Sequence, residues 1–203
     1  FQSNVPGLYV IGELGGRGLI KNAINEGKLA IEHLAGTLNK PARTPVSISA
    51  PAAANGAAAA GGGMHDVAIV GSGPAGLSAA IAAQRAGLDA ILLEQGTLAE
   101  TISKYPRKKL LLAEPMKVPL YGDLWVADAS KEELLAIWEQ AVERCGIRVL
   151  THRRVEEIEP AGGVFFLRAG AETFAARRVV LAMGRRGTPR RLGVPGEALN
   201  KVF

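Results

Sequence analysis

The sequence has 203 residues, 48% hydrophobic and 21% charged, which excludes overall disorder and predicts a globular protein of one domain or slightly more. A formal net charge of +5 with only 5% aromatic residues is weak support for a nucleic-acid partner, and we expect none. With no apolar run long enough to span a bilayer and no signal peptide, we expect a cytoplasmic protein without a membrane span.

Composition divides the chain into three parts. Residues 1–36 have ordinary globular composition and end in a helical pattern, with Gly36 as the expected C-cap. Residues 37–63 are rich in Pro, Ala, Gly and Ser, which predicts a flexible linker with a reach of roughly 30 Å. Residues 64–203 form a second, well-patterned segment.

The second segment opens with a β-α-β pattern. Short apolar runs at 66–70 and 89–94 predict buried parallel strands, and 74–86 predicts the helix between them. Ser130 and Glu133 have the spacing of a capping box, which predicts a helix that continues to Cys145.

The rest of the segment consists of short apolar runs. Residues 147–150 predict a further strand, and the runs 155–159, 164–168 and 172–175 are separated by turn residues, as in an antiparallel meander. Residues 178–182 predict a last buried strand. We therefore expect an α/β fold, a Rossmann-like parallel sheet with a small antiparallel β-meander.

A glycine-rich turn follows the first of these strands. It comprises Gly71, Ser72, Gly73, Pro74, Ala75 and Gly76. The GxGxxG spacing gains meaning because it joins a predicted strand to a predicted helix. Gly71 permits the tight turn, Gly73 lets a pyrophosphate approach the backbone, and Gly76 lets helix and strand pack closely. The helix N-terminus can then hold phosphates.

An acidic residue stands where such a site needs one. Glu94 lies about 20 residues beyond Gly71, at the end of the second strand, where it can accept hydrogen bonds from both ribose hydroxyls and disfavour NADP. We place Glu94 and the adjacent Gln95 among the cofactor-binding residues. The alternative is a glycine-rich turn in an α/β protein that binds no nucleotide.

Three motifs in the second segment resemble one family. VAIVGSGPAGLSAAIAAQRAGLDAILLEQG, TISKYPRKKLLLAEP and VVLAMGRRGTPRRLGVPGE occur in the order found in thioredoxin-reductase-like flavoproteins, closest to the bacillithiol-disulfide-reductase-like branch. The resemblance implies that the dinucleotide is FAD. It also implies adenine contacts from the Val155 backbone, a closing glycine at Gly184, and NAD(P)H as the electron donor of the complete enzyme.

The first segment resembles the other end of the same family. In VPGLYVIGELGGRGLIKNAINEG, Gly12 and Glu13 take the place of the family's Gly-Asp or Gly-Glu pair, whose acid binds the ribityl chain of FAD. The helix after the pair would direct its N-terminus toward the flavin. The alternative is an ordinary strand-turn-helix with a solvated Glu13.

The two segments stand in reversed order relative to the family. Either the chain straddles two tandem modules, with 1–36 ending one and 64–203 beginning the next, or it is a permuted FAD domain whose pieces complete one site. Phe1 in place of a starting methionine, and an end at Phe203 where a nicotinamide domain would follow, favour the first explanation.

The resemblance implies the FAD-binding part of an NAD(P)H-dependent flavoprotein oxidoreductase that passes electrons to a small-molecule or small-protein acceptor. The acceptor, NADH versus NADPH, and homodimerisation or fusion to electron-transfer domains stay open. A non-catalytic dinucleotide-binding module is the alternative, and a plain NAD-binding domain is disfavoured because it needs no Gly12-Glu13 pair. Cys145 is the single cysteine, which excludes a CxxC pair, and the histidines lack metal-ligand spacing. We expect no metal and identify no catalytic residue.

Overall fold

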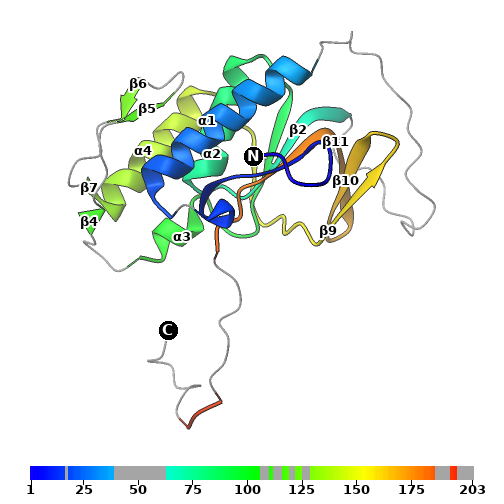
Figure 1. Cartoon of the computed structure of the whole chain (residues 1–203). Coiled ribbons are helices and arrows are strands. Elements are labelled where there is room, and N and C mark those ends of the chain that lie inside the picture. Colours follow the sequence, from blue (N-terminus) through cyan, green and yellow to red (C-terminus); the bar gives the residue numbers. More distant parts are fainter. Residues whose placement is uncertain are drawn as a thin grey trace.

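The computed structural model describes residues 1–16, 18–38, 63–105, 110–111, 116–118, 122–124, 129–185 and 193–195. Apart from its ends, the linker predicted over 37–63 lies outside the described residues. The parts before and after it pack together into one body built around a single large sheet (Figure 1).

The centre of that sheet is parallel, as the sequence predicts. Its strands are β2 (Met64–Val70), β3 (Ala90–Leu93), β8 (Val149–Leu150) and β11 (Glu172–Leu181), in the order β8-β3-β2-β11. Helix α2 (Pro74–Arg85) connects β2 to β3, which pair in parallel. The α/β architecture expected from the sequence is therefore confirmed.

The expected antiparallel meander is present, with one difference. Strands β9 (Glu157–Ala161) and β10 (Val164–Ala169) pair with each other, and β10 pairs with the first half of β11. The prediction of separate strands at 172–175 and 178–182 is wrong, because β11 runs through both. No turn residue interrupts the chain there, so the strand passes directly from the meander into the parallel sheet.

The first segment contributes β1 (Leu8–Val10), the short 3₁₀ helix η1 (Gly12–Gly15) and α1 (Ile20–Thr37). Strand β1 pairs in parallel with the second half of β11, with Leu8 opposite Val179, so β1 extends the parallel sheet beside β10. Helix α1 continues through Gly36, which is therefore not the C-cap that the sequence suggests.

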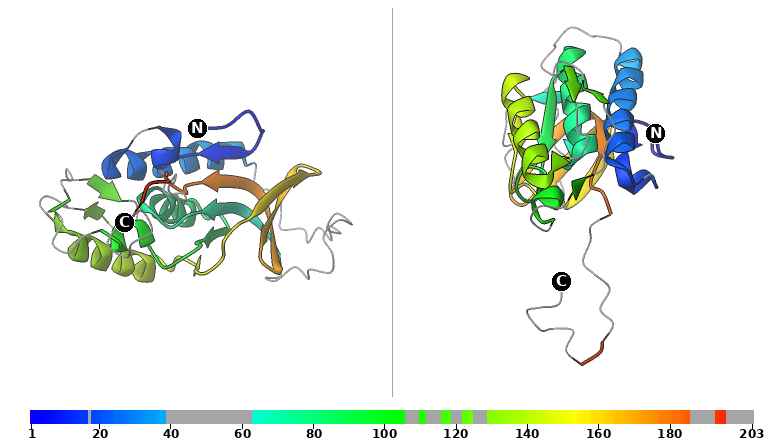
Figure 2. Two further views of the ribbon diagram at one scale, coloured as in Figure 1. Left: turned by 90° about the horizontal axis from the view of Figure 1, so that it is seen from below. Right: turned by 90° about the vertical axis from the view of Figure 1, so that its left-hand side faces the viewer.

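Helices α1, α2 and α4 (Lys131–Arg144) cover one face of the sheet (Figure 2). The capping box predicted for α4 is present: the Ser130 hydroxyl accepts a hydrogen bond from the Glu133 N–H, and the Glu133 carboxylate accepts one from the Ser130 N–H. The Glu133 carboxylate also accepts a hydrogen bond from the Ser130 hydroxyl, and the two bonds that it accepts from Ser130 lower the pKa of Glu133. The short elements are α3 (Glu100–Ser103), β4 (Leu110–Leu111), β5 (Met116–Val118), β6 (Gly122–Leu124) and β7 (Ala129–Ser130).

Strand β2 is buried on both faces, which explains its continuous apolar sequence. Val67 and Ile69 belong to the core under the helices, whereas Ala68 and Val70 belong to a second core that β10 and β11 complete. Alternate residues of a strand point to opposite faces, so a single strand contributes to both cores. The glycine-rich turn therefore begins from a rigidly held strand end.

Small residues let the first segment approach the second closely. A Cβ on Gly27 of α1 would lie 2.3 Å from the Ala75 carbonyl oxygen, and a Cβ on Gly12 would lie 2.9 Å from the Ala75 Cβ. The buried Ser78 hydroxyl of α2 donates a hydrogen bond of 2.7 Å to the Ile24 carbonyl. Contacts this close need glycine on one side, so the sequences of α1 and α2 fit each other.

Candidate functional site

The glycine-rich turn has the geometry that its sequence predicts. Gly71 has φ +104°, and a Cβ there would lie 2.6 Å from the Ala182 carbonyl oxygen. A Cβ on Gly76 would lie 1.8 Å from the Gly71 carbonyl oxygen, so this glycine permits the close packing of helix and strand. Among the described residues other than its chain neighbours, no heavy atom lies within 4 Å of a Cβ built on Gly73. Packing therefore does not require glycine here, and φ −71° is not left-handed, so the position is open to close approach of a ligand.

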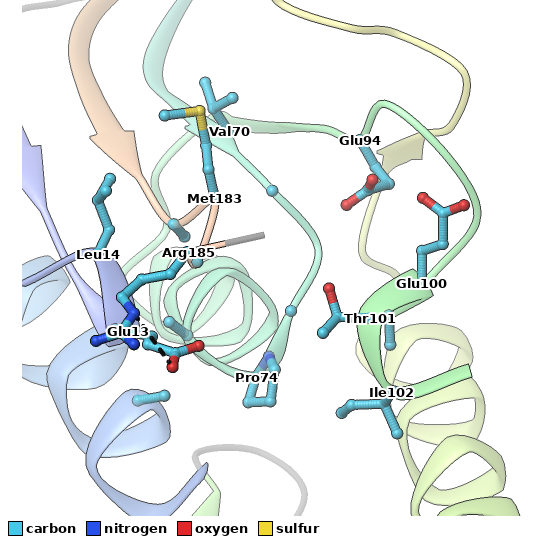
Figure 3. Close-up of a pocket in the computed structure, with 18 of the residues that line it drawn as sticks. Glu13, Leu14, Val70, Pro74, Glu94, Glu100, Thr101, Ile102, Met183 and Arg185 are labelled. Atoms are coloured by element: carbon cyan, nitrogen blue, oxygen red, sulfur yellow. Dashed lines mark ion pairs between the residues drawn. The ribbon is translucent and has the colours of Figure 1, made fainter. Parts of the chain in front are cut away.

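The turn lies on a cavity of about 830 Å³, within the usual range for small-molecule sites. Helix α2 begins at Pro74 with Gly73 as its N-cap, and Gly73, Pro74 and Ala75 all line the cavity, so the N-terminus of the helix is at the cavity wall. In Figure 3, Pro74 lies between two groups of charged side chains, Glu94 with Glu100 on one side and Glu13 with Arg185 on the other. The helix dipole favours a negatively charged ligand between them.

Glu94 is a buried carboxylate at the end of β3. Its Oε2 accepts hydrogen bonds of 2.8 Å from both the N–H and the hydroxyl of Ser72, and its Oε1 accepts one of 2.9 Å from the Gly96 N–H. These donors compensate for burial of the charge. The neighbouring Glu100 also lines the cavity and pairs with Lys104.

The opposite end of the cavity is built by the first segment. Gly12 and Glu13 open η1, and Glu13 Oε1 lies 3.6 Å from Arg185 Nε in the segment after β11. The buried Glu26 of α1 accepts a hydrogen bond of 2.7 Å from the Gly12 N–H at the start of η1. Helix α1 therefore holds η1 in place, and Arg185 reaches Glu13 of η1 from the second segment (Figure 3).

The cofactor-binding residues predicted from the sequence converge on this cavity with two exceptions. Those that line it are Gly12, Glu13, Gly71, Gly73, Pro74, Ala75, Glu94, Gln95, Val155 and Gly184. Ser72 and Gly76 do not: Ser72 is fully buried against Glu94, and Gly76 packs on Gly71.

Several residues of the site are not among the cofactor-binding residues predicted from the sequence. Glu26 was detectable, because it is an acidic residue on the apolar face that α1 buries between Ala23 and Ala30. Glu100 and Arg185 were not, because loop and short-helix residues far apart in sequence reach the cavity only through the fold. Burial raises the pKa of the Cys145 thiol, which fits the interpretation of an unreactive core cysteine.

Within the described ranges, no three or more His, Cys, Asp or Glu residues gather as a metal site would require. Among the same residues, no helix is long and apolar enough to cross a membrane.

Comparison with known proteins gives a family match over most of the second segment and similar individual proteins. A family model described as "Pyridine nucleotide-disulphide oxidoreductase" matches residues 68–203. Bacilliredoxin reductase Bdr of Bacillus subtilis (strain 168) is 30% identical over 139 residues, covering 66% of this chain and 43% of that protein. Thioredoxin reductase of Mycolicibacterium smegmatis is 35% identical over 140 residues, covering 66% of this chain and 39% of that protein.

A solved structure is similar as well. Bacillithiol disulfide reductase Bdr from Staphylococcus aureus matches with a TM-score of 0.60 and 25% sequence identity, covering 69% of this chain and 44% of that one. This chain therefore spans less than half the length of each of these relatives.

Proposed function

Because the chain belongs to the pyridine nucleotide-disulphide oxidoreductase family, we propose that it is the FAD-binding part of an NAD(P)H-dependent flavoprotein oxidoreductase. The relatives confirm the resemblance to thioredoxin-reductase-like flavoproteins and to their bacillithiol-disulfide-reductase-like branch. Bound FAD would supply the redox chemistry, taking a hydride from NAD(P)H and passing electrons to an acceptor. The names of the relatives favour a small-molecule or small-protein disulfide as that acceptor.

The observation that carries the proposal is the open position at Gly73. It lies on the cavity, at the N-terminus of α2, and its missing side chain leaves room that no described residue other than its chain neighbours fills. The pyrophosphate of FAD fits there, because backbone N–H groups and the helix dipole stabilise its charge. Glu94 would accept a hydrogen bond from the adenosine ribose, and the Val155 backbone would contact the adenine.

The flavin half of the ligand would lie toward the first segment. Glu13 would bind the ribityl chain and Gly12 would allow its close approach, while Gly184, which also lines the cavity, would take the place of the family's closing glycine. We include the domain organisation in the proposal: residues 1–36 and 64–203, joined by the linker 37–63, form one dinucleotide site. The close packing at Gly12 and Gly27 supports it.

Replacing Glu94 with alanine is expected to weaken FAD binding roughly 10- to 150-fold. The ribose would lose a charge-assisted hydrogen bond of about 1.5–3 kcal/mol, and about 1.4 kcal/mol corresponds to a factor of ten. Titration of the chain with FAD, followed by flavin fluorescence, measures the change. Glu159→Ala removes an exposed carboxylate on β9 and should leave the affinity unchanged. Equal affinities for Glu94→Ala and the parent chain would remove Glu94 from the site.

A further inference from the structure

Ser72 connects three separate parts of the site without lining the cavity. Its side chain is fully buried, and its hydroxyl and backbone N–H both donate to Glu94 Oε2 at 2.8 Å. The same hydroxyl accepts a hydrogen bond of 3.1 Å from the Ala99 N–H. The glycine-rich turn, the end of β3 and the segment before α3 are therefore joined through Ser72 Oγ.

These bonds fix the position of the hydroxyl hydrogen and of the carboxylate. A serine hydroxyl has one hydrogen to donate, and here Glu94 receives it while Ala99 uses a lone pair. Ala99 itself has φ +50°, an uncommon conformation for a residue with a side chain, and its N–H needs a partner because the residue is buried. The serine therefore supports a constrained segment as well as the carboxylate.

The bonds also determine what Glu94 can offer a ligand. An ionised carboxylate has about four lone-pair directions. Ser72 uses two of them on Oε2, and the Gly96 N–H uses one on Oε1. One direction on Oε1 is left for a ribose hydroxyl. Because the carboxylate is already held, its rotamer freedom is not lost when the ligand binds.

We propose that Ser72 is a positioning residue that holds Glu94 in the rotamer that binds the adenosine ribose. The inference rests on the proposed FAD site and deepens it, since it assigns Ser72 to the adenosine half of the ligand through Glu94. Without the hydroxyl, Glu94 Oε2 loses one of its two donors, and the carboxylate can turn away from the ribose. The Ala99 N–H is then left without its acceptor.

The test compares Ser72→Ala with the parent chain, with ADP as probe for the adenosine half and FAD for the whole ligand. We expect both affinities, measured by calorimetry, to fall about 10-fold, corresponding to about 1.4 kcal/mol. Ser78→Ala is the matched control, because Ser78 is equally buried and, like Ser72, does not line the cavity, but its hydroxyl bonds to the Ile24 carbonyl and not to Glu94. Its ADP affinity should match the parent chain.

A double-mutant cycle separates positioning from a general structural role. In a Glu94→Ala background, Ser72→Ala should weaken ADP binding less than 2-fold, because the group it positions is absent. Equal losses in both backgrounds, or none in the parent background, would overturn the inference. Ser72→Cys, a similar size with a weak donor, should also lose affinity, and it replaces the alanine variant if that variant unfolds. A parent chain that binds neither FAD nor ADP would instead refute the proposed function.

Discussion

Replacing Gly73 with valine is expected to abolish FAD binding while leaving the chain folded. Among the described residues other than its chain neighbours, no heavy atom lies within 4 Å of a Cβ at this position, so the added side chain begins in open space and we expect the fold to be kept. Gly73 lines the cavity at the N-terminus of α2, where the pyrophosphate must approach the backbone. The valine would occupy that space, and affinity should fall at least about 100-fold, or roughly 3 kcal/mol.

A series of two variants makes this test quantitative. Gly73→Ala should lose less affinity than Gly73→Val, because the loss follows the volume placed in the cavity. FAD titration gives the affinities, and circular dichroism with thermal unfolding checks that both variants are folded. Valine and parent chains that bind FAD equally would show that the pyrophosphate does not lie on this turn.

The second large effect is expected at Gly27, where α1 crosses α2. Its Cβ would lie 2.3 Å from the Ala75 carbonyl oxygen and 2.9 Å from the Ala79 nitrogen, both backbone atoms that cannot move independently. Gly27→Ala should therefore destabilise the protein by about 2 kcal/mol and lower Tm by roughly 4–8 °C. FAD affinity should fall with it, because Gly12 and Glu13 precede the same helix.

Gly36 offers a matched control in the same helix. It is exposed, and its Cβ would have no described neighbour within 4 Å, so Gly36→Ala should gain helix propensity of up to about 1 kcal/mol. The same substitution is thus expected to have opposite signs at the two positions. Thermal unfolding of both variants decides the matter: if Gly27→Ala is as stable as Gly36→Ala, the first segment does not dock on α2.

The parts of the fold that the sequence predicts correctly are those that depend on local sequence patterns. The strand, glycine turn and helix from β2 to α2 depend on neighbouring residues, and so does the capping box of Ser130 and Glu133. The errors occurred where tertiary contacts override local signals. Residues 172–181 form one strand because β2, β10 and β1 all pair with it, and a pattern read in short windows cannot include those partners.

In the candidate site, too, local sequence motifs could be predicted and tertiary contacts could not. Gly73 and Glu94 have a spacing that sequence alone reveals, since the motif is local to one β-α-β unit. The sequence marks Glu26 as an acidic residue on an apolar helix face, but its bond to the Gly12 N–H follows only from the packing of α1 against η1. The bonding of Ser72 to Glu94 likewise needs the register of β2 and β3. Sequence spacing identified residues that line the cavity, but the contacts that hold them in place required the fold.

The most direct test of the proposed FAD site is whether the intact chain retains FAD. The protein is incubated with FAD, freed of excess by gel filtration, and examined by visible absorption and flavin fluorescence. We expect FAD to stay bound in an equimolar ratio with quenched fluorescence, and excess ADP to displace it. Flavin that elutes only with the small molecules would contradict a single FAD site built from both segments.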